Sequence, residues 1–448
     1  MNTADRIATE VLSEFKTWPK KYHPVIRSEY IKEWVPLGGI VIQDKDNFKC
    51  VAAATGMKCL PHDKIGQTQG MTLHDWHAEI LAIRSFNNFL LKECLSMAST
   101  SSLSLDDEIC QEKTTSKYLR RRTQNEITEF EFQPFALRDD LLLHMYCSEA
   151  PCGDASMELI MASQNDSTPW EIPPSQIHKK FDDKSSLLYG RSYFSNLGCI
   201  RRKPSRSDAP LSLSKSCSDK LALKQYMSLL SSLTSLFISP KNMYLSSLIL
   251  PATQYHKVAC DRAFSATGRL MALQRGNDMD VSQRFSPTST GGYRFQPFSV
   301  YSTSLEFIYS RRQSSLRLLP GESLVASNIA SFSTPYNRGV LIGGTLQGRK
   351  QFSLRGAPPM SKHQMWQLAL EVASRMELRP LIRALEKRIN ITSTNNRTYE
   401  EMKCTNLLAK RHEAKSHVRC VLGGDAGEKG WVRNTGGENW SLCDIHSE

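Results

Sequence analysis

The chain has 448 residues, of which 57 are Lys or Arg and 45 are Asp or Glu, so its formal net charge is +12. This length allows a substantial core, and a basic balance favours a polyanionic partner because neutralised phosphates release counterions. Twelve irregularly spaced cysteines argue against a disulfide framework, and the lack of an apolar signal segment or long apolar run argues against a secreted or membrane-spanning chain. We therefore expect a protein of the cytoplasm, the nucleus or both.

Apolar residues at helical or alternating spacing predict the order of elements in the first half of the chain. Ile7, Val11 and Phe15 share one face of the first helix, and a turn-rich Asp-Lys-Asp-Asn sequence joins the first two strands into a hairpin. In chain order, we expect a helix over residues 4–18 and two hairpin strands over 39–43 and 48–54. A helix from His77 and a strand over 140–147 follow. Helices from Cys152 and from Cys217 come next, and then a strand over 242–250.

Three polar segments interrupt this pattern, and we predict that they are disordered insertions or surface loops: about 96–129, 163–196 and 275–297. The C-terminal third is predicted to be helical over residues 361–378 and 398–422, where apolar residues recur at helical spacing. No internal repeat is visible. We therefore expect an α/β fold with a mixed sheet, a helical C-terminal extension and one domain over residues 1–448.

Two short motifs indicate metal and acid–base chemistry. His77 and Glu79 stand in His-Ala-Glu, and Cys152 follows Pro151 in Pro-Cys-Gly-Asp. An imidazole and a thiolate bind zinc, and a glutamate that is not a ligand can carry protons for a water molecule at the metal. This combination matches the signature of zinc-dependent nucleobase deaminases, except that Ala155 stands where that signature has a second cysteine.

A hydrolytic zinc centre needs three protein ligands and one open position, so a third ligand must come from elsewhere in the chain. Cys147 is the nearest candidate, but it ends the predicted strand before the turn that carries Cys152. Cys217 fits better because Ser-Cys-Ser-Asp-Lys precedes an apolar helical pattern, and a helix N-terminus favours a thiolate. The sequence therefore favours His77, Cys152 and Cys217 as metal ligands, with Cys147 as the alternative to Cys217.

In this order, His-Ala-Glu, Pro-Cys-Gly and a remote Ser-Cys-Ser-Asp-Lys resemble the RNA adenosine deaminase family. That family contains the double-stranded RNA editing enzymes and the tRNA-specific adenosine deaminases. The similarity runs from Gly38 to Leu442, and it includes an Asp-Arg-Ala sequence at Arg262 and a Gly-Trp-Val sequence at Trp431. The resemblance implies a cytidine-deaminase-like fold, in which a mixed sheet forms the middle of a three-layer αβα core.

The resemblance also implies an activity, which is hydrolytic conversion of adenosine to inosine with zinc and with Glu79 as the proton carrier. The basic segment around Lys203 is similar to the tRNA branch, so the expected partner is tRNA and not DNA. The expected substrate is the adenosine 3′ of the anticodon in alanine tRNA. The alternatives are a deaminase of another RNA, such as duplex RNA, and an inert zinc-stabilised RNA-binding subunit. A structural zinc site needs no proton carrier, so Glu79 argues against the inert subunit.

Members of this family enclose inositol hexakisphosphate, because so many buried cations would be prohibitive without a counter-anion. By resemblance, Asp75 and Lys203 connect the zinc to this polyphosphate, although Asp75 could equally cap the helix that starts at His77. For Lys403 and Lys415, the alternative is an ordinary solvent-facing position. The matching polyphosphate contacts are Lys58, Arg84, Lys220, Lys362, Tyr399, Lys403, Lys415 and Trp431.

Overall fold

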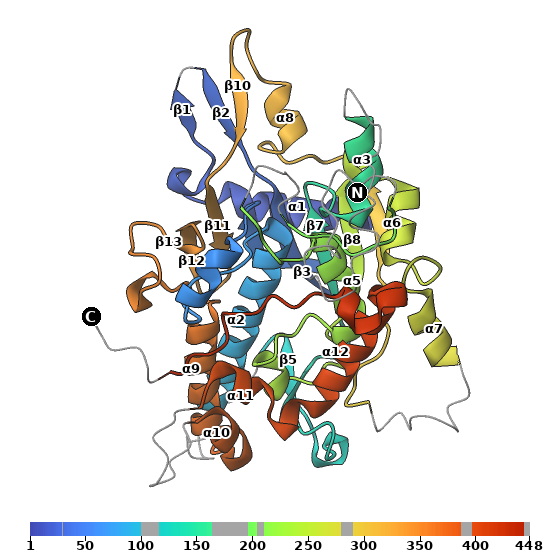
Figure 1. The fold of residues 1–448 in the computed structure, drawn as a ribbon, viewed down its shortest axis with the longest axis vertical. Coiled ribbons are helices and arrows are strands. Elements are labelled where there is room, and N and C mark those ends of the chain that lie inside the picture. Colours follow the sequence, from blue (N-terminus) through green and yellow to red (C-terminus); the bar gives the residue numbers. More distant parts are fainter. Residues whose placement is uncertain are drawn as a thin grey trace.

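The computed structural model describes residues 1–28, 30–99, 116–163, 196–203, 210–278, 290–386 and 397–442. Within these residues, the largest sheet is mixed (Figure 1) and is antiparallel from its first strand to its sixth, after which the last two strands run parallel to the sixth. In spatial order its eight strands are β13 (Thr345–Leu346), β12 (Arg338–Ile342), β11 (Ile329–Ser333), β4 (Asn47–Thr55), β3 (Leu37–Asp44), β7 (Leu141–Cys147), β8 (Leu245–Pro251) and β9 (Ser299–Thr303).

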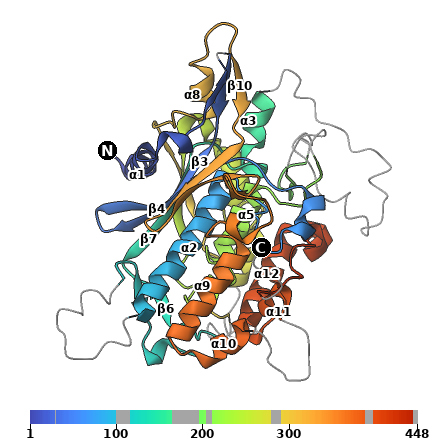
Figure 2. The ribbon, with the colours of Figure 1, turned by 90° about the vertical axis from the view of Figure 1, so that its left-hand side faces the viewer.

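Helices cover both faces of this sheet, and alternate residues of β3 show how. Val41 packs with helix α1 (Thr3–Lys16) in one apolar cluster, whereas Ile40 and Ile42 pack with helix α2 (Ala78–Ser99) in another. Figure 2 shows α1 on one side of the sheet, with α2 and the C-terminal helices on the other. The predicted three-layer αβα core with a mixed sheet is therefore confirmed.

Two adjacent glycines of β3 allow both helix layers to approach closely. A Cβ atom on Gly38 would lie 3.1 Å from the carbonyl carbon of Ala78 and from the backbone nitrogen of Glu79. A Cβ atom on Gly39 would lie 2.5 Å from a methyl group of Val11. The start of α2, which carries Glu79, therefore rests directly on the backbone of the central sheet.

The C-terminal extension is helical, as predicted, and packs on the α2 side of the sheet. The prediction of one continuous helix over residues 398–422 is wrong, because the helical conformation is interrupted at Cys404 and Thr405. The extension consists of α9 (Lys362–Arg375), α10 (Arg379–Leu385), α11 (Tyr399–Lys403), η10 (Asn406–Leu408), α12 (Ala409–Leu422) and η11 (Gly424–Gly430).

The predicted insertions are partly regular structure. Residues 116–129, placed in a disordered insertion by the sequence, include β5 (Leu119–Arg121), which pairs with β6 (Phe135–Leu137), and a turn of η4 (Gln124–Glu126) closed by a capping box at Thr123. Helix α7 (Met271–Asp278) extends into the third predicted insertion. Residues 100–115, 164–195 and 279–289 lie outside the described residues.

A small second sheet, which the sequence did not predict, projects from the main body together with helix α8 (Arg311–Ser315), as Figure 1 shows.

None of the described helices combines the length and apolar character that crossing a membrane requires. The remaining described elements are β1 (Ile26–Ser28), β2 (Ile31–Trp34) and β10 (Ser323–Ala326) of the small second sheet, α3 (Met157–Ala162), α5 (Cys217–Met227), α6 (Lys257–Phe264), η1 (Lys20–Tyr22), η2 (His62–Gln67), η5 (Asp154–Ser156), η6 (Thr234–Leu236), η7 (Ala252–Gln254) and η9 (Leu354–Gly356).

The close contact at Gly38 predicts a position-specific loss of stability. Gly38→Val should lower the free energy of unfolding by about 1–3 kcal/mol, because backbone atoms of Ala78 and Glu79 cannot rotate away from the added methyl groups. Gly66→Ala is the matched control, since the nearest atom to its Cβ would be 3.6 Å away. Urea unfolding of the two variants measures the difference. Equal stability of the Gly38 variant and the unaltered protein would contradict this packing.

Candidate functional site

The sheet topology brings three distant segments to one edge. Strand β4 ends at Thr55 and strand β7 ends at Cys147, and these residues pair with the first two residues of β3. Helix α2 follows β4 in the chain, and helix α5 lies between the parallel strands β7 and β8, so both helices begin near this edge. Ligand sites in open α/β sheets form at such carboxyl ends of strands.

His77 immediately precedes helix α2, where its backbone nitrogen donates to Asp75 Oδ1 at 3.1 Å. Cys152 lies in the turn after β7 and not in a helix, since the first helical turn starts at Asp154. The next residue, Gly153, has a φ of 105° and a Cβ position only 2.2 Å from Ser216 Oγ, so this turn requires glycine.

Cys217 is the first residue of α5, as the sequence predicted. The Ser216 side chain caps this helix by accepting from the backbone nitrogen of Asp219 at 3.1 Å. The backbone nitrogen of Cys217 in turn donates to Cys152 Sγ at 3.3 Å. The positive end of α5 is therefore directed at the Cys152 sulfur and favours its thiolate form.

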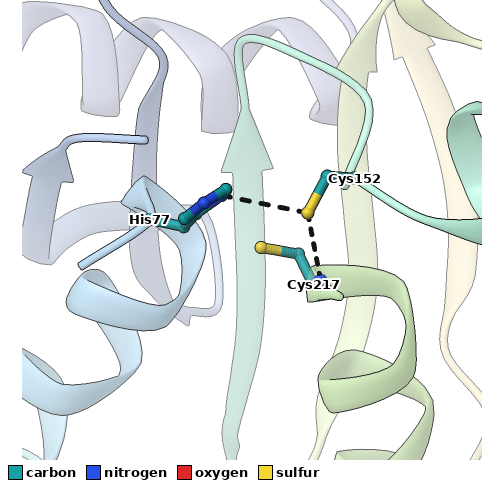
Figure 3. A group of neighbouring side chains, drawn as sticks. All are labelled: His77, Cys152 and Cys217. Atoms are coloured by element: carbon teal, nitrogen blue, oxygen red, sulfur yellow. Dashed lines mark hydrogen bonds between the residues drawn. The ribbon is translucent and has the colours of Figure 1, made fainter. Parts of the chain in front are cut away.

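The ligand atoms of His77, Cys152 and Cys217 all lie within 4.8 Å of one another, and Figure 3 shows them turned toward a common point. Cys152 Sγ is 3.8 Å from His77 Nδ1. Tetrahedral ligands of zinc are about 3.6 Å apart, so small rotations of these side chains suffice for coordination. Cys147 ends β7 and is buried, and it is not part of this group among the described residues.

Glu79 is the second residue of α2 and is buried beside the three ligand residues. Its Oε2 atom lies 3.4 Å from Cys217 Sγ. Burial, reinforced by the negative charge of Cys152, raises the pKa of the Glu79 carboxyl group. A carboxyl group with a raised pKa can both accept and release a proton near neutral pH.

The two thiols have unlike protonation preferences. Contact with Cys217 lowers the pKa of Cys152 well below its ordinary value, although burial opposes this, and Lys203 and His77 add to the lowering. Burial raises the pKa of Cys217 well above its ordinary value. Lys203 Nζ nevertheless lies 3.0 Å from Cys217 Sγ and stabilises a negative charge there. The thiolate form is therefore favoured at Cys152, whereas burial opposes it at Cys217.

Asp75 contacts both the start of the His77 helix and the lysines beside the ligand group. Its carboxylate accepts from the backbone nitrogen of His77 at 3.1 Å, from Lys203 at 2.9 Å, from Ser214 at 3.1 Å and from Lys220. Burial opposes ionisation of Asp75, but Lys203 and Lys220 hold its pKa well below the ordinary range. The carboxylate is therefore charged and links the group at Cys217 to Lys220.

A second buried site lies beyond Lys220, on the C-terminal side of the molecule, and consists mainly of cations and aromatic rings. Lys362 and Lys403 each place Nζ 5.2 Å from the centre of the Tyr399 ring, and Arg419 lies over Trp431 at 5.7 Å. The main nearby acid is Glu438, which pairs with Lys403. We call this group the basic cluster, and it comprises Arg84, Lys224, Lys362, Tyr399, Lys403, Arg411, Lys415, Arg419 and Trp431.

The basic cluster carries more positive charge than its own acids balance. Burial lowers the pKa of Lys362 to about 7, and burial with neighbouring cations lowers those of Lys224 and Lys415 well below the ordinary value. The Nε atoms of Arg84 and Arg419 are buried without a hydrogen-bond partner in the described structure. Orphaned buried donors and suppressed ammonium charges are expected where an anion belongs.

The structure brings most of the predicted polyphosphate contacts together, but not all. Lys58 is directed elsewhere, since its ammonium group donates to the side chain of Asn328. Sequence reasoning missed Lys224, Arg411 and Arg419, which contribute to the basic cluster. The available signal was Lys224, a lysine that follows the apolar run Leu221-Ala222-Leu223 in α5.

Comparison with known proteins assigns the family. Residues 52–434 match the adenosine-deaminase (editase) domain. The tRNA-specific adenosine deaminase 1 of Schizosaccharomyces pombe is 34% identical over 440 residues, which cover 98% of this chain and 96% of that protein. The Drosophila melanogaster protein of the same name is 27% identical, over 83% of this chain and 82% of its own length. The double-stranded RNA-specific editase Adar of the same fly is 26% identical over 54% of this chain and 34% of its own length. With the site residues inside the matched range, the chain belongs to the adenosine-deaminase (editase) family and is an enzyme that acts on adenosine.

Proposed function

We propose that this protein hydrolyses adenosine to inosine in tRNA, with zinc bound by His77, Cys152 and Cys217. The observation that carries the proposal is the convergence of these three ligand atoms beside the buried, non-ligating Glu79. A donor set of one imidazole and two thiolates suits zinc, and three protein ligands leave a position for water. A structural zinc site would fill all four positions with protein.

The chain's own residues then divide the chemistry. Zinc would supply Lewis acidity, which makes water a nucleophile at neutral pH. Glu79 would take one proton from the attacking water and deliver it to a ring nitrogen as the C–O bond forms at C6 of the base. It would then move the second proton, from the new hydroxyl group, to the amine as the C–N bond breaks, which releases ammonia. Lys203 holds the negative charge of Cys217, and Asp75 fixes both Lys203 and the start of the His77 helix.

The RNA substrate follows from the relatives. A relative that is similar over almost the whole chain is a tRNA-specific adenosine deaminase, whereas the similarity to the fly duplex-RNA editase covers about half of this chain. An anticodon loop presents unstacked bases, so the adenosine can enter the site without opening a helix. We propose the adenosine 3′ of the anticodon in alanine tRNA as the substrate, and the cytoplasm or nucleus as the compartment, where the thiol ligands stay reduced.

The basic cluster supports a second bound group, inositol hexakisphosphate. Its buried lysines, its arginines with orphaned Nε atoms and its aromatic rings suit a compact polyanion with many phosphate oxygens. Lys220 would link this anion to Asp75 and hence to the metal site. The role of the polyphosphate would be to permit the burial of these cations and so to fix α5, α9 and α12 around the site.

The reaction and its substrate can be tested together. The zinc-loaded protein should form inosine in an alanine tRNA transcript at the adenosine 3′ of the anticodon, but not in duplex RNA or free adenosine. Sequencing of the anticodon loop measures the product. Inosine in duplex RNA alone would exclude the tRNA proposal.

The matched variant for this assay is Glu79→Gln, which keeps the shape of the side chain but cannot carry a proton. It should retain zinc and the unfolding temperature of the unaltered protein while its rate falls at least about 100-fold. Activity that remains within a few-fold of the unaltered enzyme would show that Glu79 is not the proton carrier.

The choice of the third ligand can be tested by metal analysis. Cys217→Ala should lose zinc, because only two ligand residues remain, whereas Cys147→Ala should keep one zinc ion per chain. Both side chains are buried, so the Cys147 variant also controls for the general effect of removing a core thiol. Zinc retained by the Cys217 variant and lost from the Cys147 variant would reverse the assignment.

The polyphosphate proposal predicts an unusual pH dependence. The ordinary pKa of lysine is 10.5 and that of Lys362 in the anion-free fold is about 7. Between these values the unfolded chain binds more protons, so the anion-free protein should become more stable as pH rises, by up to about 1.4 kcal/mol per pH unit for this group. Added inositol hexakisphosphate should abolish this rise, because its charge keeps the ammonium group protonated.

Urea unfolding with and without the polyphosphate measures this dependence, and anion chromatography of the denatured protein measures the bound anion. Lys362→Met should reduce the anion content. Lys410→Met is the matched control on α12, since Lys410 pairs with Glu413 outside the basic cluster. Stability of the anion-free protein that falls as pH rises from neutral would contradict the proposal.

A further inference from the structure

Both cysteine ligands stand in the same short pattern, with an aspartate two residues later. The first is Cys152-Gly153-Asp154 and the second is Cys217-Ser218-Asp219. The two sulfur-bearing turns are 65 residues apart in the chain, so the intervening chain does not by itself fix the separation of the two sulfur atoms. Tertiary contacts must hold the turns, and both aspartates are completely buried.

One short segment supplies an arginine to each of these aspartates. Arg262, in helix α6, donates through Nε to Asp154 Oδ2 at 3.1 Å and through a terminal nitrogen to the Asp154 carbonyl oxygen at 2.9 Å. Arg269, in the loop that follows α6, donates to Asp219 Oδ1 at 2.7 Å. A guanidinium group is planar and offers several donors, so each arginine fixes direction as well as distance.

The remaining aspartate oxygens hold further parts of the site. Asp154 Oδ1 accepts from the backbone nitrogen of Gly198 at 2.8 Å. Asp219 Oδ2 accepts from Ser216 Oγ at 2.6 Å and from the backbone nitrogen of Arg201 at 2.9 Å, two residues before Lys203. Each carboxylate therefore connects a cysteine turn, the α6 segment and the chain segment that leads to Lys203.

Arg269 also bonds back to its own segment, since its Nε atom donates to the carbonyl oxygen of Ala263 at 3.1 Å. The two arginines are thereby tied to one rigid unit at the end of α6. Their side chains are 18% and 6% exposed, so water competes little for the ion pairs.

We propose that Arg262 and Arg269 are paired positioning residues, which set the separation of Cys152 and Cys217 by holding Asp154 and Asp219 on one element. Neither arginine contacts the ligand atoms; each acts through the aspartate beside a ligand. The proposal rests on the zinc site proposed above, and it adds α6 as the element that keeps the two sulfur ligands at coordinating distance before the metal binds.

The test is metal affinity of the full-length protein, measured by competition with a chromophoric chelator. Arg262→Met and Arg269→Met should each weaken zinc binding about 10–100-fold, which is the usual cost of losing a residue that orients a ligand. The visible absorption bands of the Co²⁺-loaded protein should also shift, because those bands report ligand geometry. Unchanged affinity together with unchanged bands in both variants would overturn the proposal.

Two controls separate positioning from general stability. Glu158→Gln removes the negative charge of the other partner of Arg262, at 2.9 Å, while leaving the bond to Asp154. Arg338→Met removes an arginine ion pair with Glu14 on the opposite face of the sheet. Both controls should leave the zinc affinity and the Co²⁺ bands unchanged. A loss of affinity with Glu158→Gln equal to that of Arg262→Met would overturn the proposal.

A double variant tests the route through the aspartate. If Arg262 acts only through Asp154, then Arg262→Met combined with Asp154→Asn should bind zinc no more weakly than the weaker-binding single variant. Fully additive losses would instead place the effect of Arg262 elsewhere. Because zinc affinity is measured without RNA, failure of this proposal is distinguishable from failure of the tRNA assay.

Discussion

The ion pairs of the Asp75 carboxylate connect the two buried groups of charges, which are the metal-ligand group and the basic cluster. It lies between two ammonium groups, those of Lys203 and Lys220, and it also fixes the backbone at His77. Removing one partner of a buried pair costs about 3–5 kcal/mol, because the other charge is left uncompensated. Without Asp75, two buried cations would face each other directly. Among the described residues, the carboxylate of Asp75 therefore compensates the charge of both lysines where the metal-ligand group meets the basic side chains.

The two faces of the main sheet differ in polarity, and the buried charged groups lie on one of them. The face covered by α1 is closed by apolar side chains such as Phe15, Val41 and Phe307. The metal ligands, Asp75 and the basic cluster all lie on the side of α2, α5 and α12. One face thus supplies mainly hydrophobic stabilisation, while the other accepts buried ions that stabilise little by themselves.

Local pattern was sufficient for the central fold. The hairpin of β3 and β4, strand β7 and the start of α5 at Cys217 were predicted because they combine apolar alternation or helical spacing with clear turn or capping residues. The break at Cys404 and Thr405 was not predictable in this way, because apolar residues keep nearly helical spacing across it. The short strands β9 to β13 were missed since each is too brief to show a period.

The sequence was sufficient to predict those site residues that stand in short, recognisable motifs. His77, Glu79, Cys152 and Cys217 carry recognisable motifs, and the sheet topology brings three of them within coordinating reach. The positions of long cationic side chains are harder to predict from sequence, because they depend on charged groups brought close by the tertiary fold and not on neighbours in sequence. Lys58 was expected in the polyphosphate site by resemblance yet donates to Asn328, whereas Arg411 was not expected there and lies buried among backbone carbonyl groups.

Metal ligands and buried cations differ in predictability because their positions are fixed in different ways. A metal ligand contributes through a short, stiff side chain whose position follows from the backbone, so the sequence motif and the structure coincide. A buried lysine or arginine is stable only when the complete set of opposing charges is present. The basic cluster is drawn from α2, α5, α9, α11 and α12, and in α12 four lysines and arginines stand against the single acid Glu413. The positions of these side chains are therefore determined by the assembled fold and not by any one segment of the sequence, and the anion proposed to occupy the cluster would supply the charge that its own acids lack.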